Sequence, residues 1–131
     1  MTAWKILLAE DDADDQKLFV DFLAHRTDFQ LLPVVENGVE LLETLDTVDN
    51  KDLPDIIILD QNMPKSNGLQ TLSILKQSER YEHLPVVIYS TYTDDQLITN
   101  SKNAGASMVL SKPVTKQGYE EMIDSILKLV H

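Results

Sequence analysis

The sequence contains no cysteine among its 131 residues, which excludes disulfide bonds and thiolate metal sites. Its four glycines form no glycine-rich loop after an apolar run, so a P-loop and a dinucleotide-binding fingerprint are both missing. No apolar run reaches the length of a membrane span, and the run before the first acidic residues is too short for a signal peptide. We therefore expect a soluble, cytoplasmic protein.

Basic residues are scarce: 11 lysines and arginines stand against 22 acidic residues, which gives a formal net charge of -11. Nucleic-acid-binding proteins usually present a basic face, and anionic membranes repel an acidic chain, so we expect direct binding to neither. The length suits one domain, residues 1–131, without a separate effector domain.

Short apolar runs alternate with helical patterns along the whole chain. The predicted strands are Trp4–Ala9, Phe29–Val35, Ile56–Leu59, Pro85–Tyr89 and Ser107–Ser111. The predicted helices are Asp12–His25, a segment starting at Asn37, Asn67–Ser78, Asp94–Ala104 and Thr115–Val130. Because the connections are short and crossovers are right-handed, this order predicts an α/β domain with a doubly wound parallel sheet. Pro33 predicts an edge position for the second strand, and Thr93 and Gln96 have the spacing of a capping box.

Polar residues stand where the apolar runs end. Glu10 and Asp11 follow the first strand, and Asp60 directly follows the third. Ser90 follows the fourth strand, and Lys112 follows the fifth. Because all parallel strands end at one edge of the sheet, these side chains are predicted to converge on one crevice, where open α/β sheets bind their ligands.

The chemistry of this set points to phosphoryl transfer. Crowded carboxylates repel one another unless a cation neutralises them, and hard oxygen ligands favour a magnesium-like ion. Lys112 offers a positive charge and Ser90 a hydroxyl donor, which together suit the oxygens of a phosphoryl group. Asp60 is then a candidate nucleophile that forms an aspartyl phosphate.

Several motifs with matching spacing resemble the receiver domains of two-component response regulators. They are LLAEDD at 7–12, PDIIILDQNMPKSNG at 54–68, LPVVIYST at 84–91, AGAS at 104–107 and SKP at 111–113. The resemblance covers nearly the whole chain. It implies a single flavodoxin-like (βα)5 domain whose five-stranded sheet has the order 2-1-3-4-5.

The resemblance also implies a role for each matching residue. Asp60 is implied as the phosphoacceptor, Lys112 as the lysine that pairs with the phosphate, and Ser90 as the switch hydroxyl. Bound Mg²⁺ is implied at Glu10, Asp11, Asp60 and the backbone carbonyl of Asn62. The lysine–proline bond of the family is usually cis, and Lys112–Pro113 preserves that possibility. Val109 occupies the position where the family often has a switching Tyr or Phe.

The resemblance implies partners as well. A sensor histidine kinase or a histidine phosphotransfer protein supplies the phosphoryl group, and a separate downstream protein reads the switched surface. Turnover of an external substrate is not expected. Haloacid-dehalogenase-type phosphatases place a second aspartate two positions after the nucleophile as a general acid, and this chain has Asn62 there.

Two other interpretations remain beside this one. A receiver-like interaction domain that no longer accepts phosphate is disfavoured by the intact acids and lysine. Acidic residues also favour helix N-termini, and this explanation is sufficient for Asp12, Asp14 and Asp15, to which we assign no chemistry. The three histidines have no metal-ligand spacing, so they are predicted to face solvent: His25, His83 and His131.

Overall fold

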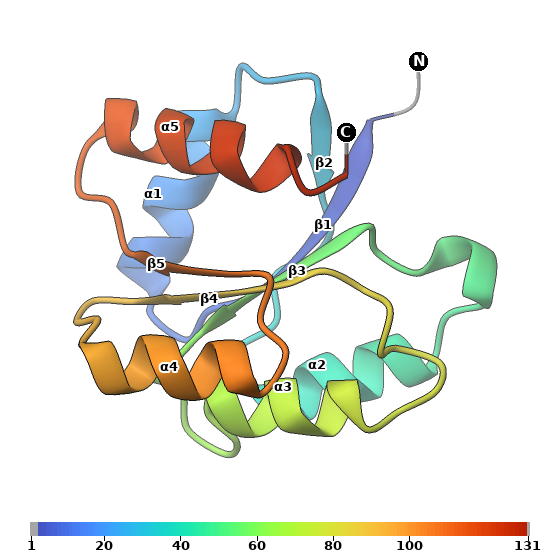
Figure 1. The fold of residues 1–131 in the computed structure, drawn as a ribbon. Coiled ribbons are helices and arrows are strands. Elements are labelled where there is room, and N and C mark those ends of the chain that lie inside the picture. Colours follow the sequence, from blue (N-terminus) through green and yellow to red (C-terminus); the bar gives the residue numbers. More distant parts are fainter. Residues whose placement is uncertain (1–2, 131) are drawn as a thin grey trace.

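The computed structural model describes residues 3–130, in which strands and α-helices alternate (Figure 1). The strands are β1 (Trp4–Ala9), β2 (Phe29–Leu31), β3 (Ile56–Asp60), β4 (Val86–Ser90) and β5 (Met108–Ser111). The helices are α1 (Ala13–Leu23), α2 (Gly38–Asp46), α3 (Gly68–Lys76), α4 (Asp95–Asn103) and α5 (Lys116–Leu127), with a 3₁₀ turn, η1 (Asn50–Asp52), before β3.

The five strands form one parallel sheet in the order β2-β1-β3-β4-β5. This confirms the predicted flavodoxin-like topology. β3 lies at the centre, and all of its residues are buried, as its unbroken apolar run predicts for a strand covered on both faces. Within residues 3–130, no helix has the length and apolarity of a membrane span.

Helices cover both faces of the sheet. In Figure 1, α1 and α5 lie on one face, and α2, α3 and α4 lie on the other. Because side chains alternate along a strand, Ile56 and Ile58 enter the core under α1 and α5, whereas Ile57 and Leu59 enter the core under α2 and α3. Two apolar layers therefore fix the central strand, and with it the position of the residue at its carboxyl end.

The second strand is shorter than predicted. We expected it to span Phe29–Val35, but regular pairing ends at Leu31. Pro33 has no N–H to donate, which interrupts the ladder. The chain still follows β1, since the amide of Val35 donates to the carbonyl of Leu8 at 3.0 Å. The predicted edge position of this strand is confirmed.

The helix ends follow their capping residues. Asp12 lies outside α1 and caps it, and Asn37 caps α2 as its position predicts. The predicted capping box at Thr93 is wrong, because the side chain of Asp94 accepts the amide of Leu97 instead. Each helix starts within one or two residues of its predicted start, which is the usual uncertainty of helix boundaries.

Gly38 at the start of α2 lies close to α3 and to the loop before it. A Cβ atom at this position would lie 2.7 Å from the backbone oxygen of Ser66 and closer still to Oγ1 of Thr71. Thr71 is fully buried, and its hydroxyl also bonds to the carbonyl of Asn67 at 2.8 Å. Glycine is required here because any larger side chain would clash with these atoms, and not because the backbone has a conformation that favours glycine.

Gly38→Ala is expected to destabilise the protein. Helix propensity alone predicts a gain of about 1 kcal/mol, whereas the clash with a backbone atom predicts a net loss above about 2 kcal/mol. Urea unfolding measures the difference. Gly118→Ala is the matched control, because its new Cβ would meet the Pro113 side chain at 3.0 Å but no backbone atom closer than 3.8 Å. An unchanged or raised stability of Gly38→Ala would contradict the close approach.

Candidate functional site

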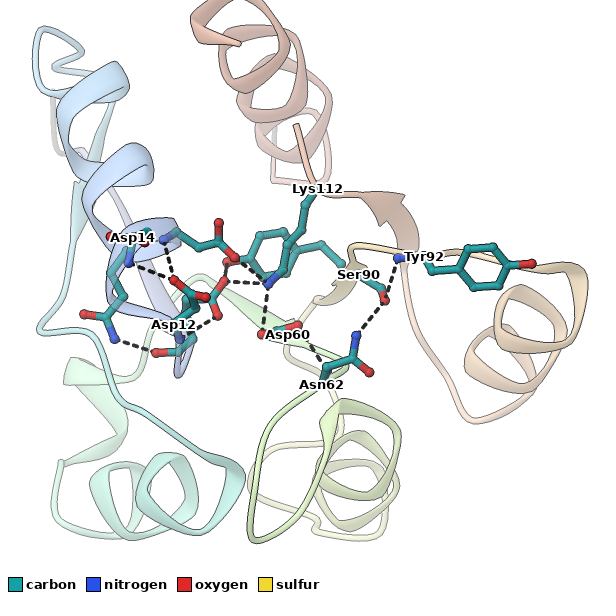
Figure 2. A network of polar contacts seen from close by, with 11 residues as sticks. Asp12, Asp14, Asp60, Asn62, Ser90, Tyr92 and Lys112 are labelled. Carbon is teal, nitrogen blue, oxygen red and sulfur yellow. Dashed lines mark hydrogen bonds and ion pairs between the residues drawn. The ribbon is translucent and has the colours of Figure 1, made fainter. Parts of the chain in front are cut away.

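The polar residues at the strand ends converge at one edge of the sheet (Figure 2). Asp60 and Ser90 are the last residues of β3 and β4, not the first residues of the following loops, and each is only 1% exposed. Glu10 directly follows β1 and is fully buried, and Lys112 directly follows β5. The structure thus brings together the site residues that the sequence predicted at this edge.

The ammonium group of Lys112 lies among three carboxylates. Its Nζ is 3.0 Å from Oε1 of Glu10, 3.0 Å from Oδ2 of Asp60 and 3.0 Å from Oδ2 of Asp15. These contacts raise the pKa of Lys112, even though burial opposes the charge. Asp15 lies on the first turn of α1, and the helix dipole was a sufficient explanation for an acid at this position of the sequence. Its contact with Lys112 was therefore not predicted.

Glu10 is held by donors on both of its oxygens. The hydroxyl of Tyr89 donates to Oε1 at 2.5 Å, and the amide of Asp12 donates to Oε2 at 3.1 Å. Burial raises the pKa of Glu10, but hydrogen bonds with Asp60, Tyr89 and Lys112 outweigh it and hold this pKa below its ordinary value. Tyr89 was not predicted as a site residue. Its signal in the sequence is a tyrosine in a buried strand directly before Ser90.

Asp60 has the opposite shift. Burial, and then the neighbouring Glu10, raise the pKa of Asp60 to about 7, while the amide of Asn62 and the ammonium of Lys112 lower it only partly. The Asn62 amide donates to Oδ1 of Asp60 at 3.1 Å. The carboxyl group at the centre of the site is therefore short of positive charge.

The acidic residues of this edge have the geometry of a cation site. Glu10, Asp11 and Asp60 can place one oxygen each within 4.8 Å of one another, and Asp11 is exposed to solvent. These are hard oxygen donors without a nitrogen or sulfur ligand, a set that fits Mg²⁺ or Mn²⁺. The unbalanced charge on Asp60 is what a divalent ion at this position would neutralise.

Ser90 connects the site to the loop between β4 and α4. Its Oγ accepts the amide of Tyr92 at 3.3 Å and the side-chain amide of Asn62 at 3.4 Å. The ring of Tyr92 points away from the carboxylates and is 73% exposed (Figure 2). Further along the loop, Oγ1 of Thr93 lies 2.8 Å from Oγ of Ser111 at the end of β5. Two hydroxyl contacts thus fix this loop against the sheet.

The bond before Pro113 is trans and not the cis bond that the resemblance allows, since residues 3–130 contain no cis peptide bond. The trans linkage suffices to aim Lys112 inward, since its ammonium already reaches Asp60 at 3.0 Å. Val109 is half-buried and packs against the core under α2 and α3.

The histidines lie outside the site. His25 and His83 are exposed, as predicted, and Nε2 of His25 lies 3.0 Å from Oε1 of Glu120. His131 lies outside the described residues.

Comparisons with known proteins agree with this geometry. The family model described as "Response regulator receiver domain" matches residues 6–124. Chemotaxis protein CheY1 of Helicobacter pylori is 27% identical over 121 residues, which are 92% of this chain and 95% of that protein.

Solved structures show the same likeness. The phosphorylated cyanobacterial phytochrome response regulator RcpA superposes with a TM-score of 0.82 at 27% identity, covering 95% of this chain and 91% of RcpA. The Mn²⁺-bound form of response regulator Rcp1 superposes with a TM-score of 0.79 at 27% identity, covering 94% and 91%. The family match spans most of the chain, and the polar residues lie at the strand ends as the motifs predict. This chain belongs to the response-regulator receiver domains of two-component signalling.

Proposed function

We propose that this receiver domain accepts a phosphoryl group on Asp60 from a phosphohistidine of a sensor kinase or phosphotransfer protein. The observation that carries the proposal is the contact between Lys112 and Asp60, at 3.0 Å, inside a cluster of acidic residues. A buried carboxylate beside a lysine and a hydroxyl provides a nucleophile together with donors for the oxygens of the incoming group. The phosphorylated state of RcpA, a related receiver, supports this assignment.

The transfer is a displacement at phosphorus. A carboxylate oxygen of Asp60 forms the new O–P bond while the P–N bond of the phosphohistidine breaks, and its electron pair returns to the imidazole nitrogen. Lys112 donates to a phosphoryl oxygen, since its ammonium already lies at the carboxylate. The Ser90 hydroxyl accepts hydrogen bonds in the structure, so its own proton remains available for a second phosphoryl oxygen.

Asp11 and Asp60, with the backbone carbonyl of Asn62 and with Glu10, are the groups that would hold Mg²⁺. A bound divalent ion supplies positive charge to a site whose carboxylates outnumber its one ammonium group. The manganese bound by Rcp1 supports a divalent ion in this family. Burial and the neighbouring Glu10 raise the pKa of Asp60 to about 7, and a bound divalent ion would favour its ionised form.

The proposed output is a change in the β4–α4 loop. Movement of the Ser90 hydroxyl toward a phosphoryl oxygen releases the amide of Tyr92 and displaces the contact between Thr93 and Ser111. Val109 has a short and stiff side chain, so it cannot sweep the volume that a switching aromatic ring does. A separate protein that binds this surface then carries the signal.

Asp60→Asn is expected to abolish phosphorylation. With Mg²⁺ and a small phosphodonor such as acetyl phosphate, the wild-type chain gains one phosphoryl group, which intact-mass spectrometry detects. The variant keeps the shape of the side chain but replaces the nucleophilic carboxylate with a neutral amide. Asp14→Asn, an exposed acid on α1, is the matched control and should be phosphorylated normally. Full phosphorylation of Asp60→Asn would refute the assignment.

Without divalent metal, stability is expected to depend on the charge of Asp60. Its pKa is raised from 3.8 to about 7 in the folded state, so the folded protein binds the proton more tightly than the unfolded chain. This contribution to stability is lost as pH rises through that range. Relative to wild type, Asp60→Asn should therefore gain stability with rising pH, reaching on the order of 2 kcal/mol at pH 8.

Unfolding in urea with chelator, followed between pH 4 and pH 8, measures this difference. At pH 8, Mg²⁺ should raise the wild-type melting temperature, Asp11→Ala should lose that rise, and Asp14→Ala should retain it. A difference between wild type and Asp60→Asn that does not vary with pH would show that Asp60 is not destabilised by its charge.

Switching is expected to need Ser90 and not Val109. Beryllofluoride, a phosphoryl mimic, should shift the amide resonances of Ser90 to Leu97 in the wild-type chain. Ser90→Ala removes the hydroxyl that pulls the loop, so these shifts should vanish, whereas Val109→Ala should leave them largely unchanged. The opposite pattern, with Val109→Ala silent and Ser90→Ala responsive, would exclude the hydroxyl-driven route.

A further inference from the structure

Tyr89 is a fully buried tyrosine for which the proposed phosphoryl transfer has no use. Its hydroxyl donates to Oε1 of Glu10 at 2.5 Å. Its ring centre lies 5.1 Å from Nζ of Lys112, within the range of a cation–π contact. One side chain therefore contacts both the acid that follows β1 and the lysine that follows β5.

The hydrogen bonds of Glu10 limit what this carboxylate can offer a metal ion. Each carboxylate oxygen has about two lone-pair positions. Oε1 accepts the Tyr89 hydroxyl at 2.5 Å and has the Lys112 ammonium at 3.0 Å, so both of its positions are used. Oε2 accepts the amide of Asp12 at 3.1 Å, and Asp60 is a further hydrogen-bonding neighbour of this carboxylate, so at most one position remains for a cation. Glu10 can thus contact a cation through one oxygen but not through both.

This restriction separates the two common hard cations. Mg²⁺ is small, prefers octahedral geometry and keeps several of its waters, so a carboxylate limited to one oxygen can still bind it directly or through a water. Ca²⁺ takes six to eight oxygen ligands and readily uses a carboxylate through both oxygens. With Glu10 limited to one oxygen, the group of Glu10, Asp11 and Asp60 matches the first ion better than the second.

We propose that Tyr89 is a positioning residue that sets the metal selectivity of the site. Its hydroxyl occupies the lone pair on Glu10 that Ca²⁺ would need for bidentate binding, and the site therefore favours Mg²⁺. The inference rests on the divalent-metal site of the proposed function but does not depend on phosphoryl transfer.

The test is calorimetric titration of Mg²⁺ and Ca²⁺ into the full chain and into Tyr89→Phe. The substitution removes the hydroxyl but keeps the ring under Lys112. Once the position that Tyr89 occupies on Oε1 is free, Ca²⁺ affinity should rise at least about fivefold while Mg²⁺ affinity changes less than about twofold. Tyr119→Phe is the matched control, since Tyr119 is 1% exposed in the same core cluster, and it should alter neither affinity.

A second substitution identifies the oxygen responsible. Glutamine has only one side-chain oxygen and cannot bind bidentately, so Glu10→Gln in the Tyr89→Phe background should remove the gain in Ca²⁺ affinity. A purely structural role for Tyr89 would instead weaken both ions together. An unchanged ratio of the two affinities in Tyr89→Phe, or a Ca²⁺ gain that survives Glu10→Gln, would overturn the inference.

The hydrogen bond between Tyr89 and Glu10 can also be observed directly in the wild-type chain. The hydroxyl proton of Tyr89 should give a downfield proton resonance in the metal-free wild-type chain that Tyr119→Phe retains, and its absence would contradict the inference. Failure of the proposed function gives a different result. A wild-type chain that binds Mg²⁺ selectively but is never phosphorylated refutes the proposed phosphoryl transfer and leaves the role of Tyr89 intact. Binding of neither ion refutes the metal site and the role of Tyr89 together.

Discussion

One ammonium group shared by three carboxylates is the interaction on which this structure depends. Lys112 contacts Glu10, Asp15 and Asp60, each at 3.0 Å, and these acids come from the end of β1, the first turn of α1 and the end of β3. Two of the three are almost completely buried, where an unpaired charge would be strongly destabilising. Lys112 directly follows the edge strand β5. Its ion pairs therefore connect this edge of the sheet to the end of the central strand β3 and to the first turn of α1.

The neutralisation is incomplete, and this explains the chemistry of the site. One positive charge cannot balance three carboxylates together with the exposed Asp11. Burial and the neighbouring Glu10 raise the pKa of Asp60, whereas hydrogen bonds outweigh burial at Glu10 and hold its pKa below the ordinary value. Glu10 accepts hydrogen bonds from more donors than Asp60 does, which stabilises its ionised form. Asp60 therefore binds a proton more readily than Glu10, and protonation of Asp60 reduces the repulsion between the two carboxylates. The shortage of positive charge is thus concentrated on the residue proposed to accept the phosphoryl group.

Much of this arrangement could be predicted from the sequence, because it follows from the parallel sheet. Strands that run in one direction bring Glu10, Asp60, Ser90 and Lys112 to one edge whatever the details of packing. The contact between Asp15 and Lys112 could not be predicted, because an acid at a helix N-terminus looks the same in the sequence whether it faces solvent or a lysine. Its contact depends on how far Lys112 extends and on how α1 docks. Backbone details such as the shortened β2 and the cap at Asp94 likewise reflect local donors that a hydrophobic pattern does not reveal.

The alternation of side chains along β4 gives the site its two sides. Tyr89 points toward the core under α1 and α5 and contacts Glu10, whereas Ser90, the next residue, contacts Asn62 and the β4–α4 loop. The acidic side and the loop side are therefore separated by a single peptide unit at the end of a fully buried strand. The acidic cluster and the β4–α4 loop contact adjacent residues of one strand, so their proximity does not depend on an aromatic side chain at Val109.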